Sequence, residues 1–299
     1  MPEQCLICGT RGALCRIRDM EMLLCPSCGF LWLKDKILPS DHYSNVAVGI
    51  DEAKTLRRRR NAIDRTNIIR RHLLLNNTCD VGTGEGLFLK VLDEHGYTGC
   101  CGIEPGADGV AHARSLGLDV ICGSIDDVGS IAEARNIGVI TLFHVIEHLD
   151  DPRGDIQKLH DALPSGGHLV IETPNLRGFS PRTIRDDWEL FYPEHLWYFD
   201  NRTLPGFLKQ FGFRIIAQGK RDFDSEGKGI PELLFRLGLR RQGEKSSKYT
   251  QPSGQSTSSS PPWKHSRYSF FRSMIRWFLE TLVQWSGRVD YFWAIAQKP

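Results

Sequence analysis

The sequence predicts a doubly wound α/β domain built on a mostly parallel sheet of seven strands. A small metal-binding domain precedes it, and a helical insertion stands before its last strand. Three observations predict this fold. Between residues 76 and 222, short apolar segments alternate with helical segments, an order typical of a parallel sheet covered by helices. A glycine-rich turn follows the first apolar segment, and two Cys-x-x-Cys pairs stand near the N-terminus.

The two cysteine pairs predict a zinc ribbon over residues 1–40. Cys5-x-x-Cys8 is followed after 16 residues by Cys25-x-x-Cys28, and a glycine follows the second cysteine of each pair. This spacing fits a four-thiolate zinc site. Because a segment of this length cannot bury much apolar surface, a bound metal would supply the folding energy. Four protein ligands leave no open position, which predicts a structural zinc.

Composition narrows the remaining function classes. The chain has 299 residues with a net charge of +2, which gives no general reason to expect a nucleic-acid partner. It contains no run of about 18 apolar residues, so no transmembrane helix is predicted. The first residues lack a signal-peptide pattern, and the nine cysteines are then expected to be reduced thiols in a cytoplasmic protein.

Residues 41–75 are predicted to form a helical connector rich in arginine. Charge runs of this kind usually form a solvated helix face. A phosphate-binding patch near the active site is the alternative. The arginines are Arg57, Arg58, Arg59, Arg60, Arg65, Arg70 and Arg71.

The stretch from Cys79 to Pro105 predicts a ligand-binding strand–helix–strand unit. It contains a short strand, the turn Gly82-Thr83-Gly84-Glu85-Gly86, a helix, and a second strand that ends at Glu104. Glycines let the backbone turn sharply and lie against a ligand. An acid at the end of the second strand can accept hydrogen bonds from both hydroxyls of a ribose. Asp80, just before the turn, is placed to reach the amino group of an amino-acid-like ligand.

Further strands are predicted at 118–122, 138–143, 168–173 and 213–222, and a last antiparallel strand within 289–299. Ligands of such sheets bind outside the carboxyl ends of the strands. Asp80, Glu104, Ser124, His144 and Thr173 are therefore expected at one edge of the sheet.

The Asp-x-Gly-x-Gly-x-Gly run with its later strand-end Glu104 resembles motifs I and II of class I S-adenosylmethionine (SAM)-dependent methyltransferases. The resemblance implies the Rossmann-like methyltransferase fold for residues 76–222, with SAM as cofactor. The cofactor-binding residues that it implies are Asp80, Gly82, Gly84, Gly86, Glu104, Ser124, Ile125, Phe143 and His144.

The segment His144-x-x-Glu147-His148 matches an inverted zinc-protease pattern, although here it follows a buried strand rather than lying on a long helix. It is also similar to the Glu-His-Leu-x-Asp-Pro run of ubiquinone-type methyltransferases. Some of these bind a divalent metal through Glu-x-x-Glu-His. Because His144 replaces the first glutamate of that pattern, a second metal at His144, Glu147 and His148 is left open.

The loop from Trp188 to Phe199 resembles the Pro-Glu-His-x-x-Tyr-Phe loop that covers the substrate in methyltransferases of glycan and lipid biosynthesis. Its Tyr-x-Glu-His arrangement is also similar to that of zinc-ribbon sugar C-methyltransferases. The resemblance implies a catalytic set in which His195 is a general base and Glu194 or Tyr192 orients it. In the alternative, these residues only pin the loop. We expect its aromatic side chains to form a lid over a sugar.

Residues 223–288 are predicted to be a linker and helical insertion. The apolar stripe of the helix at 268–285 predicts packing against the domain, and a membrane-surface helix is the alternative.

Together these features predict SAM-dependent methyl transfer to a hydroxyl or carbon of a sugar, nucleotide-sugar or lipid-linked intermediate. A zinc-ribbon RNA methyltransferase and a non-catalytic zinc-ribbon binding module are the alternatives. Neither the acceptor atom nor the oligomeric state is predicted.

Overall fold

The structure is a computed structural model of the whole chain, and it describes residues 1–36, 52–183, 185–221 and 290–299. The predicted linker and helical insertion at 223–288, including the amphipathic stretch 268–285, lie outside the described residues. Residues 37–40 of the predicted ribbon and residues 41–51 of the predicted connector lie outside them as well.

The described elements follow the predicted alternation, with boundaries shifted by a few residues. The strands are β1 (Ala13–Ile17), β2 (Met20–Leu24), β3 (Leu31–Leu33), β4 (Thr78–Val81), β5 (Cys101–Glu104), β6 (Val120–Cys122), β7 (Val139–Phe143), β8 (His168–Pro174), β9 (Trp197–Tyr198), β10 (Arg214–Arg221) and β11 (Tyr291–Gln297). The α-helices are α1 (Glu52–Ile69), α2 (Leu87–Glu94), α3 (Ala107–Ser115), α4 (Val128–Arg135), α5 (Pro152–Ala162), α6 (Phe179–Thr183) and α7 (Thr203–Lys209). Short 3₁₀ helices lie at Ile125–Asp127, Ile146–His148 and Arg185–Asp187.

The large sheet has seven strands in the order β10-β11-β8-β7-β4-β5-β6. The ladders from β8 to β6 are parallel, whereas β11 is antiparallel to both of its neighbours, β8 and β10. This confirms the predicted mostly parallel sheet of the Rossmann-like methyltransferase fold. The last strand lies between the fifth and sixth strands of the domain rather than at the edge.

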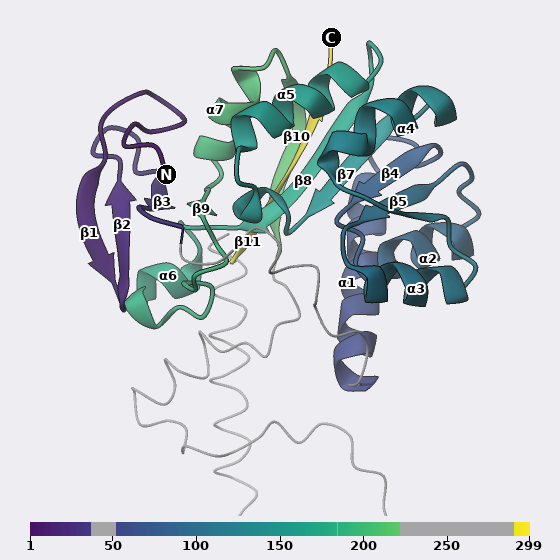
Figure 1. Cartoon of the computed structure of the whole chain (residues 1–299), viewed down its shortest axis with the longest axis horizontal. Coiled ribbons are helices and arrows are strands. Elements are labelled where there is room, and N and C mark those ends of the chain that lie inside the picture. The colour runs from purple at the N-terminus through teal and green to yellow at the C-terminus, as the bar shows by residue number, and fades with distance from the viewer. Residues whose placement is uncertain (37–51, 184, 222–289) are drawn as a thin grey trace, which may run out of the picture.

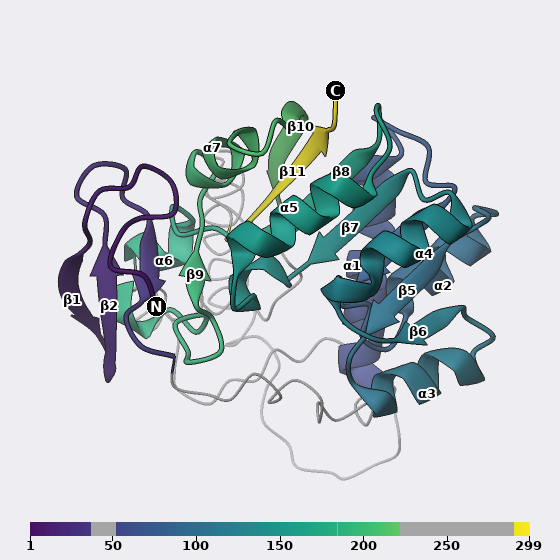
Figure 2. The same ribbon diagram turned by 45° about the horizontal axis from the view of Figure 1, so that its top comes forward.

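Helices cover both faces of this sheet (Figures 1 and 2). Helices α4 and α5 lie on one face, and α1 and α2 lie on the other. The strands supply alternate side chains to the two layers, as the pleat of a strand requires. Ile140 and Leu142 of β7 join the core on the α4–α5 side, and Val139 joins the core with Ala62 and Phe88 on the α1–α2 side.

The predicted zinc ribbon shares its sheet with the large domain. Its strands β1, β2 and β3 form a second sheet with β9, which comes from the loop after β8. Leu31 pairs with Tyr198 and Trp32 pairs with Trp197. The ribbon sheet is therefore completed by a segment more than 160 residues away in the sequence, and Figure 2 shows the two side by side.

Aromatic side chains fill the junction between the ribbon and the large domain. Phe30 stacks on Trp32 at a centroid distance of 5.6 Å and on Trp197 at 6.3 Å. Trp188, Trp197 and Tyr198 are almost completely buried. This corrects the predicted lid, because these three aromatics are used in a core with the ribbon. Burial of such large rings stabilises the folded state by about 2–3 kcal/mol each.

No helix within the described ranges is long and apolar enough to cross a membrane.

Candidate active site

The glycine turn after β4 has the backbone shape that its sequence predicts. Gly82, Gly84 and Gly86 all have positive φ angles, which residues with a Cβ rarely adopt. A Cβ on Gly82 would lie 2.6 Å from Val145 Cγ2, whereas a Cβ on Gly84 would meet open space. The turn therefore packs tightly at its start and presents bare backbone to a ligand at its centre.

Glu104 at the end of β5 is tied to this turn. Its carboxylate accepts hydrogen bonds from Gly84 N and Gly106 N, each at 2.8 Å. A carboxylate offers about four acceptor positions. The two backbone bonds therefore orient the group and leave it able to accept hydrogen bonds from two hydroxyls of a ligand.

Asp80 lies at the end of β4, almost completely buried beneath the turn. Thr141 Oγ1 donates a hydrogen bond of 2.6 Å to Asp80 Oδ1. Burial raises the pKa of Asp80 to about 6, although the hydrogen bond from Thr141 opposes the shift. A cationic amino group placed here would favour the ionised form.

A cavity of about 940 Å³ opens over these residues. Pockets for small ligands usually measure about 300–1,000 Å³, so this one can hold a cofactor and part of an acceptor. Eight of the nine residues predicted to bind the cofactor line this cavity, and Gly86 is the exception. The eight are Asp80, Gly82, Gly84, Glu104, Ser124, Ile125, Phe143 and His144. Gly86 instead packs against α3 and the segment after it, where a Cβ would lie 3.0 Å from Ala113 Cβ and 2.7 Å from Leu118 Cδ1.

Helix α1 forms one wall of the cavity. Arg58, Asn61, Ala62 and Arg65 line it, and their spacing places them on one helix face. Arg58 pairs with Glu85 at 2.9 Å, and the Arg65 guanidinium carbon lies 4.4 Å above the ring of Phe143. The arginine run is thus divided between the cavity and solvent, since Arg59 pairs with the more exposed Glu94.

A buried charge cluster centred on Glu172 of β8 supports this wall. Arg65 Nη2 lies 2.7 Å and Arg221 Nη2 lies 3.0 Å from Glu172 Oε1. Burial alone would raise the pKa of Glu172, but Arg65, His144 and Arg221 outweigh it and hold the pKa well below the usual range. Glu172 is therefore ionised, and it holds α1, β8 and β10 together at the cavity.

His144 follows β7 with a φ angle of 59°, an uncommon conformation for a residue with a bulky side chain. Its Nδ1 lies 3.3 Å from Glu147 Oε1 and its Nε2 lies 3.3 Å from Glu172 Oε1. Burial lowers the pKa of His144, but the two carboxylates more than compensate and the net shift is upward. Such strained backbone is often retained at functional sites.

The residues of the predicted catalytic set lie behind the cavity wall. His195 is 2% exposed, and Tyr192, Glu194 and His195 are not among the cavity-lining residues of the described chain. The Nδ1 atom of His195 is 2.9 Å from the carbonyl oxygen of Leu190. Burial lowers the pKa of His195 to about 3, so the ring is neutral at physiological pH.

His148 connects this loop to the cavity, whose wall it forms in part. Its Nδ1 is 2.8 Å from the carbonyl oxygen of Glu194, and its ring centroid is 4.7 Å from that of His195. Glu147 is completely buried beside them and accepts a hydrogen bond from Thr173 Oγ1 at 2.9 Å. One ligand atom each from Glu147, His148 and His195 lie within 4.8 Å of one another.

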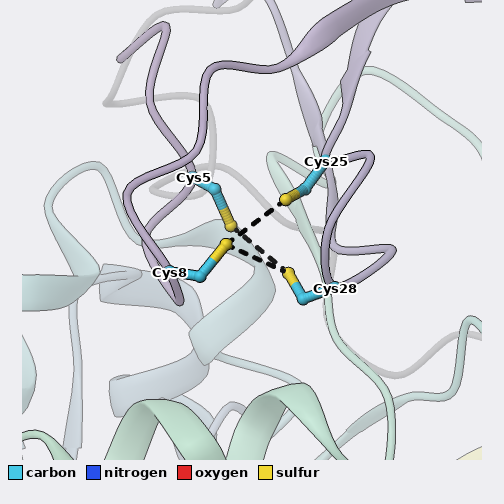
Figure 3. A group of neighbouring side chains, drawn as sticks. All are labelled: Cys5, Cys8, Cys25 and Cys28. Atoms are coloured by element: carbon cyan, nitrogen blue, oxygen red, sulfur yellow. Dashed lines mark hydrogen bonds between the residues drawn. The ribbon is translucent and has the colours of Figure 1, made fainter.

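The four cysteines of the ribbon converge on one point (Figure 3). Cys5 and Cys8 come from one loop, and Cys25 and Cys28 come from the facing loop. Their sulfur atoms are separated by 3.5 Å (Cys5–Cys28), 3.4 Å (Cys8–Cys25) and 3.8 Å (Cys8–Cys28). These distances are too long for disulfides but close to the separation of about 3.8 Å that tetrahedral Zn–S bonds of about 2.3 Å require. Gly9 and Gly29 have the positive φ angles predicted for the turns.

Sequence reasoning favoured a solvated face for α1 and gave an arginine patch near the active site only as the alternative, and it missed the cluster around Glu172. The spacing of Arg58, Asn61, Ala62 and Arg65 was a usable signal for the wall, because it marks one face of a helix. No comparable signal marked Glu172, since its partners Arg65 and Arg221 lie far from it in the sequence.

Comparison with known proteins agrees with this geometry. A family described as "Methyltransferase domain" matches residues 53–218, more than half of the chain. A search of curated proteins finds no match. The fold is similar to that of a SAM-dependent methyltransferase from Archaeoglobus fulgidus, with 16% identity, a TM-score of 0.50, and coverage of 83% of this chain and 100% of that chain. A SAM-dependent methyltransferase from Thermotoga maritima matches with 15% identity, a TM-score of 0.50, and coverage of 83% and 94%.

Proposed function

We propose that the chain, which belongs to the methyltransferase domain family, transfers the methyl group of SAM to a hydroxyl or carbon of a sugar, nucleotide-sugar or lipid-linked intermediate. The observation that carries the proposal is the shape and lining of the cavity. Its lining combines the glycine turn and His144 with polar and charged groups such as Arg58, His148 and Asp150. A polar acceptor with several hydroxyl groups suits such a lining.

In the proposed complex, SAM lies along the carboxyl ends of β4, β5 and β6. Glu104 accepts hydrogen bonds from the ribose, and the Gly82–Gly84 backbone contacts the amino-acid part. The adenine lies beside Ser124 and Ile125. Phe143, which ends β7 beside β4, and His144, which follows it, then flank the sulfonium and its methyl group.

Methyl transfer forms one bond to the acceptor and breaks the bond between the methyl carbon and sulfur. The electron pair of that bond returns to sulfur and gives neutral S-adenosylhomocysteine. The acceptor hydroxyl or C–H group loses its proton to a base. In-line positioning of the acceptor supplies most of the acceleration of such a reaction.

The general-base role of His195 stays a prediction. His148 is the histidine of this cluster that reaches the cavity wall in the described chain. A proton from the acceptor would therefore reach His195 through His148, or after the loop has moved. Glu147, next to both rings, would stabilise the resulting imidazolium.

We further propose a structural zinc on Cys5, Cys8, Cys25 and Cys28. The ion would supply folding energy and no chemistry, because four thiolates leave no open position. The pairing of β3 with β9 supports a second role, in which the ribbon positions the loop that carries His195.

Methyl transfer from radiolabelled SAM to separate pools of nucleotide-sugars, lipid-linked glycans and structured RNA tests the proposal. Labelling of a glycan-containing pool by the wild type, and not by Glu104→Ala, supports it. Labelling of RNA alone, or cofactor binding without turnover on every pool, would contradict the proposed substrate class.

A further inference from the structure

The cluster formed by Glu147, His148 and His195 lies apart from the four-cysteine site and has the composition of a second metal centre. It combines two imidazoles and one carboxylate, with one ligand atom from each residue within 4.8 Å of the others. Proteins hold zinc and other first-row transition metals with such ligands at about 2.0–2.2 Å. Small side-chain movements would close the set around one ion.

Both histidines are oriented for coordination by backbone carbonyl groups. A carbonyl oxygen only accepts hydrogen bonds, so the nitrogen facing it carries the proton. Nδ1 of His148 therefore donates to Glu194 O at 2.8 Å, and Nδ1 of His195 donates to Leu190 O at 2.9 Å. In each ring the proton on Nδ1 makes Nε2 the nitrogen with the lone pair. Metal-binding histidines are commonly held by such a hydrogen bond from the other ring nitrogen.

The two segments that carry the cluster are fastened to each other before any ion binds. Leu196 N donates to Glu147 O at 2.8 Å, and Trp197 Nε1 donates to Leu149 O at 2.7 Å. The same loop contributes the Glu194 carbonyl that holds His148. A site assembled in advance loses little conformational entropy when its ligand arrives.

His144 is not part of this ligand set. Its two ring nitrogens each face a buried carboxylate, Glu147 and Glu172, at 3.3 Å. It holds the inner side of Glu147, whose other oxygen accepts from Thr173. Carboxylate oxygens have further lone pairs, so Glu147 remains able to bind an ion while these contacts persist.

We propose that Glu147, His148 and His195 bind one divalent transition-metal ion of the zinc type at the wall of the cavity. Three protein ligands leave at least one coordination position open. Because His148 lines the cavity, this position faces the space proposed for the acceptor, where it binds an oxygen atom of that molecule. The role toward the acceptor rests on the proposed function, whereas binding of the ion does not. An ion bound to Nε2 of His195 replaces the general-base role of that ring, which then applies only to the metal-free protein.

The test is a cobalt titration of the full-length protein that has first been loaded with a single equivalent of zinc, enough to fill the four-cysteine site and leave the second site empty. Elemental analysis and the visible spectrum of Co²⁺ report a second ion, and the absence of sulfur-to-metal charge transfer separates it from the cysteine site. We expect one Co²⁺ per chain in the wild type. His195→Ala and Glu147→Gln should each bind it at least about 100-fold more weakly, since loss even of an outer hydrogen-bond partner costs about 10–100-fold.

Two further variants keep the result interpretable. His160→Ala removes a histidine of α5 that lies outside the cluster and should bind Co²⁺ as the wild type does. His195→Asp retains a metal-binding oxygen atom without introducing sulfur and should recover part of the affinity lost in His195→Ala. Retained zinc and an unchanged circular dichroism spectrum establish that each variant is folded.

Absence of a second ion in the wild type would overturn the proposal, as would equal Co²⁺ binding by folded His195→Ala. These outcomes are independent of the substrate class, because no acceptor is present. A second ion without labelling of any glycan pool would support the metal site and contradict the proposed acceptor.

Discussion

Replacing Glu104 by alanine should remove most of the affinity for the cofactor. The carboxylate is held in place by Gly84 N and Gly106 N at 2.8 Å each. Two hydrogen bonds from ribose hydroxyls to this charged acceptor contribute about 1.5–3 kcal/mol each. Their loss corresponds to about 3–6 kcal/mol, or roughly a 10²–10⁴-fold rise in Kd at 1.4 kcal/mol per factor of ten.

Isothermal titration calorimetry with SAM or S-adenosylhomocysteine measures this change. Glu94→Ala is a matched control, because Glu94 ends α2 and pairs with Arg59 outside the cavity lining. Its Kd should equal that of the wild type. Glu104→Gln keeps one acceptor oxygen and should show a smaller loss than Glu104→Ala. A folded Glu104→Ala protein whose Kd stays within threefold of the wild type would refute the assignment of Glu104 to the ribose.

Three further outcomes are expected. Cys25→Ser should lose the zinc and, in hydrogen-exchange experiments, the amide protection of Trp197 and Tyr198, while β4 stays protected; retained protection at β9 would separate the loop from the ribbon. Glu172→Gln should lower the free energy of unfolding by about 3–5 kcal/mol in urea denaturation, since it leaves buried arginines unpaired. Because the pKa of Glu172 is depressed, its contribution is present above about pH 4.5 and is lost as the pH falls, so the difference between wild type and variant should shrink in acid. His195→Ala should retain SAM binding and lose about 10²–10⁴ in kcat on the true acceptor; near-normal kcat would leave His195 a structural role.

The features of the large domain that could be predicted from the sequence are local ones. Each buried strand is a short apolar segment, and the three glycines of the Gly82–Gly86 turn indicate positive φ angles there. The strand-end position of Glu104 follows from the same pattern. Parallel strands bring their carboxyl ends to one edge, so the residues that line the cofactor side of the cavity were largely predictable once the strands were known.

The features that the sequence did not predict depend on pairs far apart in the chain. The ladder between Trp32 and Trp197 joins two apolar segments that each look like an ordinary core strand or loop. Nothing in the Trp188–Phe199 loop indicates whether its aromatics face a ligand or another domain. In the structure these aromatics are buried against the ribbon. His195 is buried as well and lies behind His148, which lines the cavity. The cluster of Glu172 with Arg65 and Arg221 has the same origin.

The position of β9 gives the ribbon a physical connection to the chemistry of the cavity. Residues 192–196 must bridge from the large domain to β9, and over this short span they hold His148 and present His195. Such a short bridge has few conformations once β9 is paired with β3. Metal binding at the cysteines, of which Cys28 lies three residues before β3, would therefore narrow the positions open to His195. A ribbon that only stabilised its own loops would not require a strand from the catalytic domain to complete its sheet.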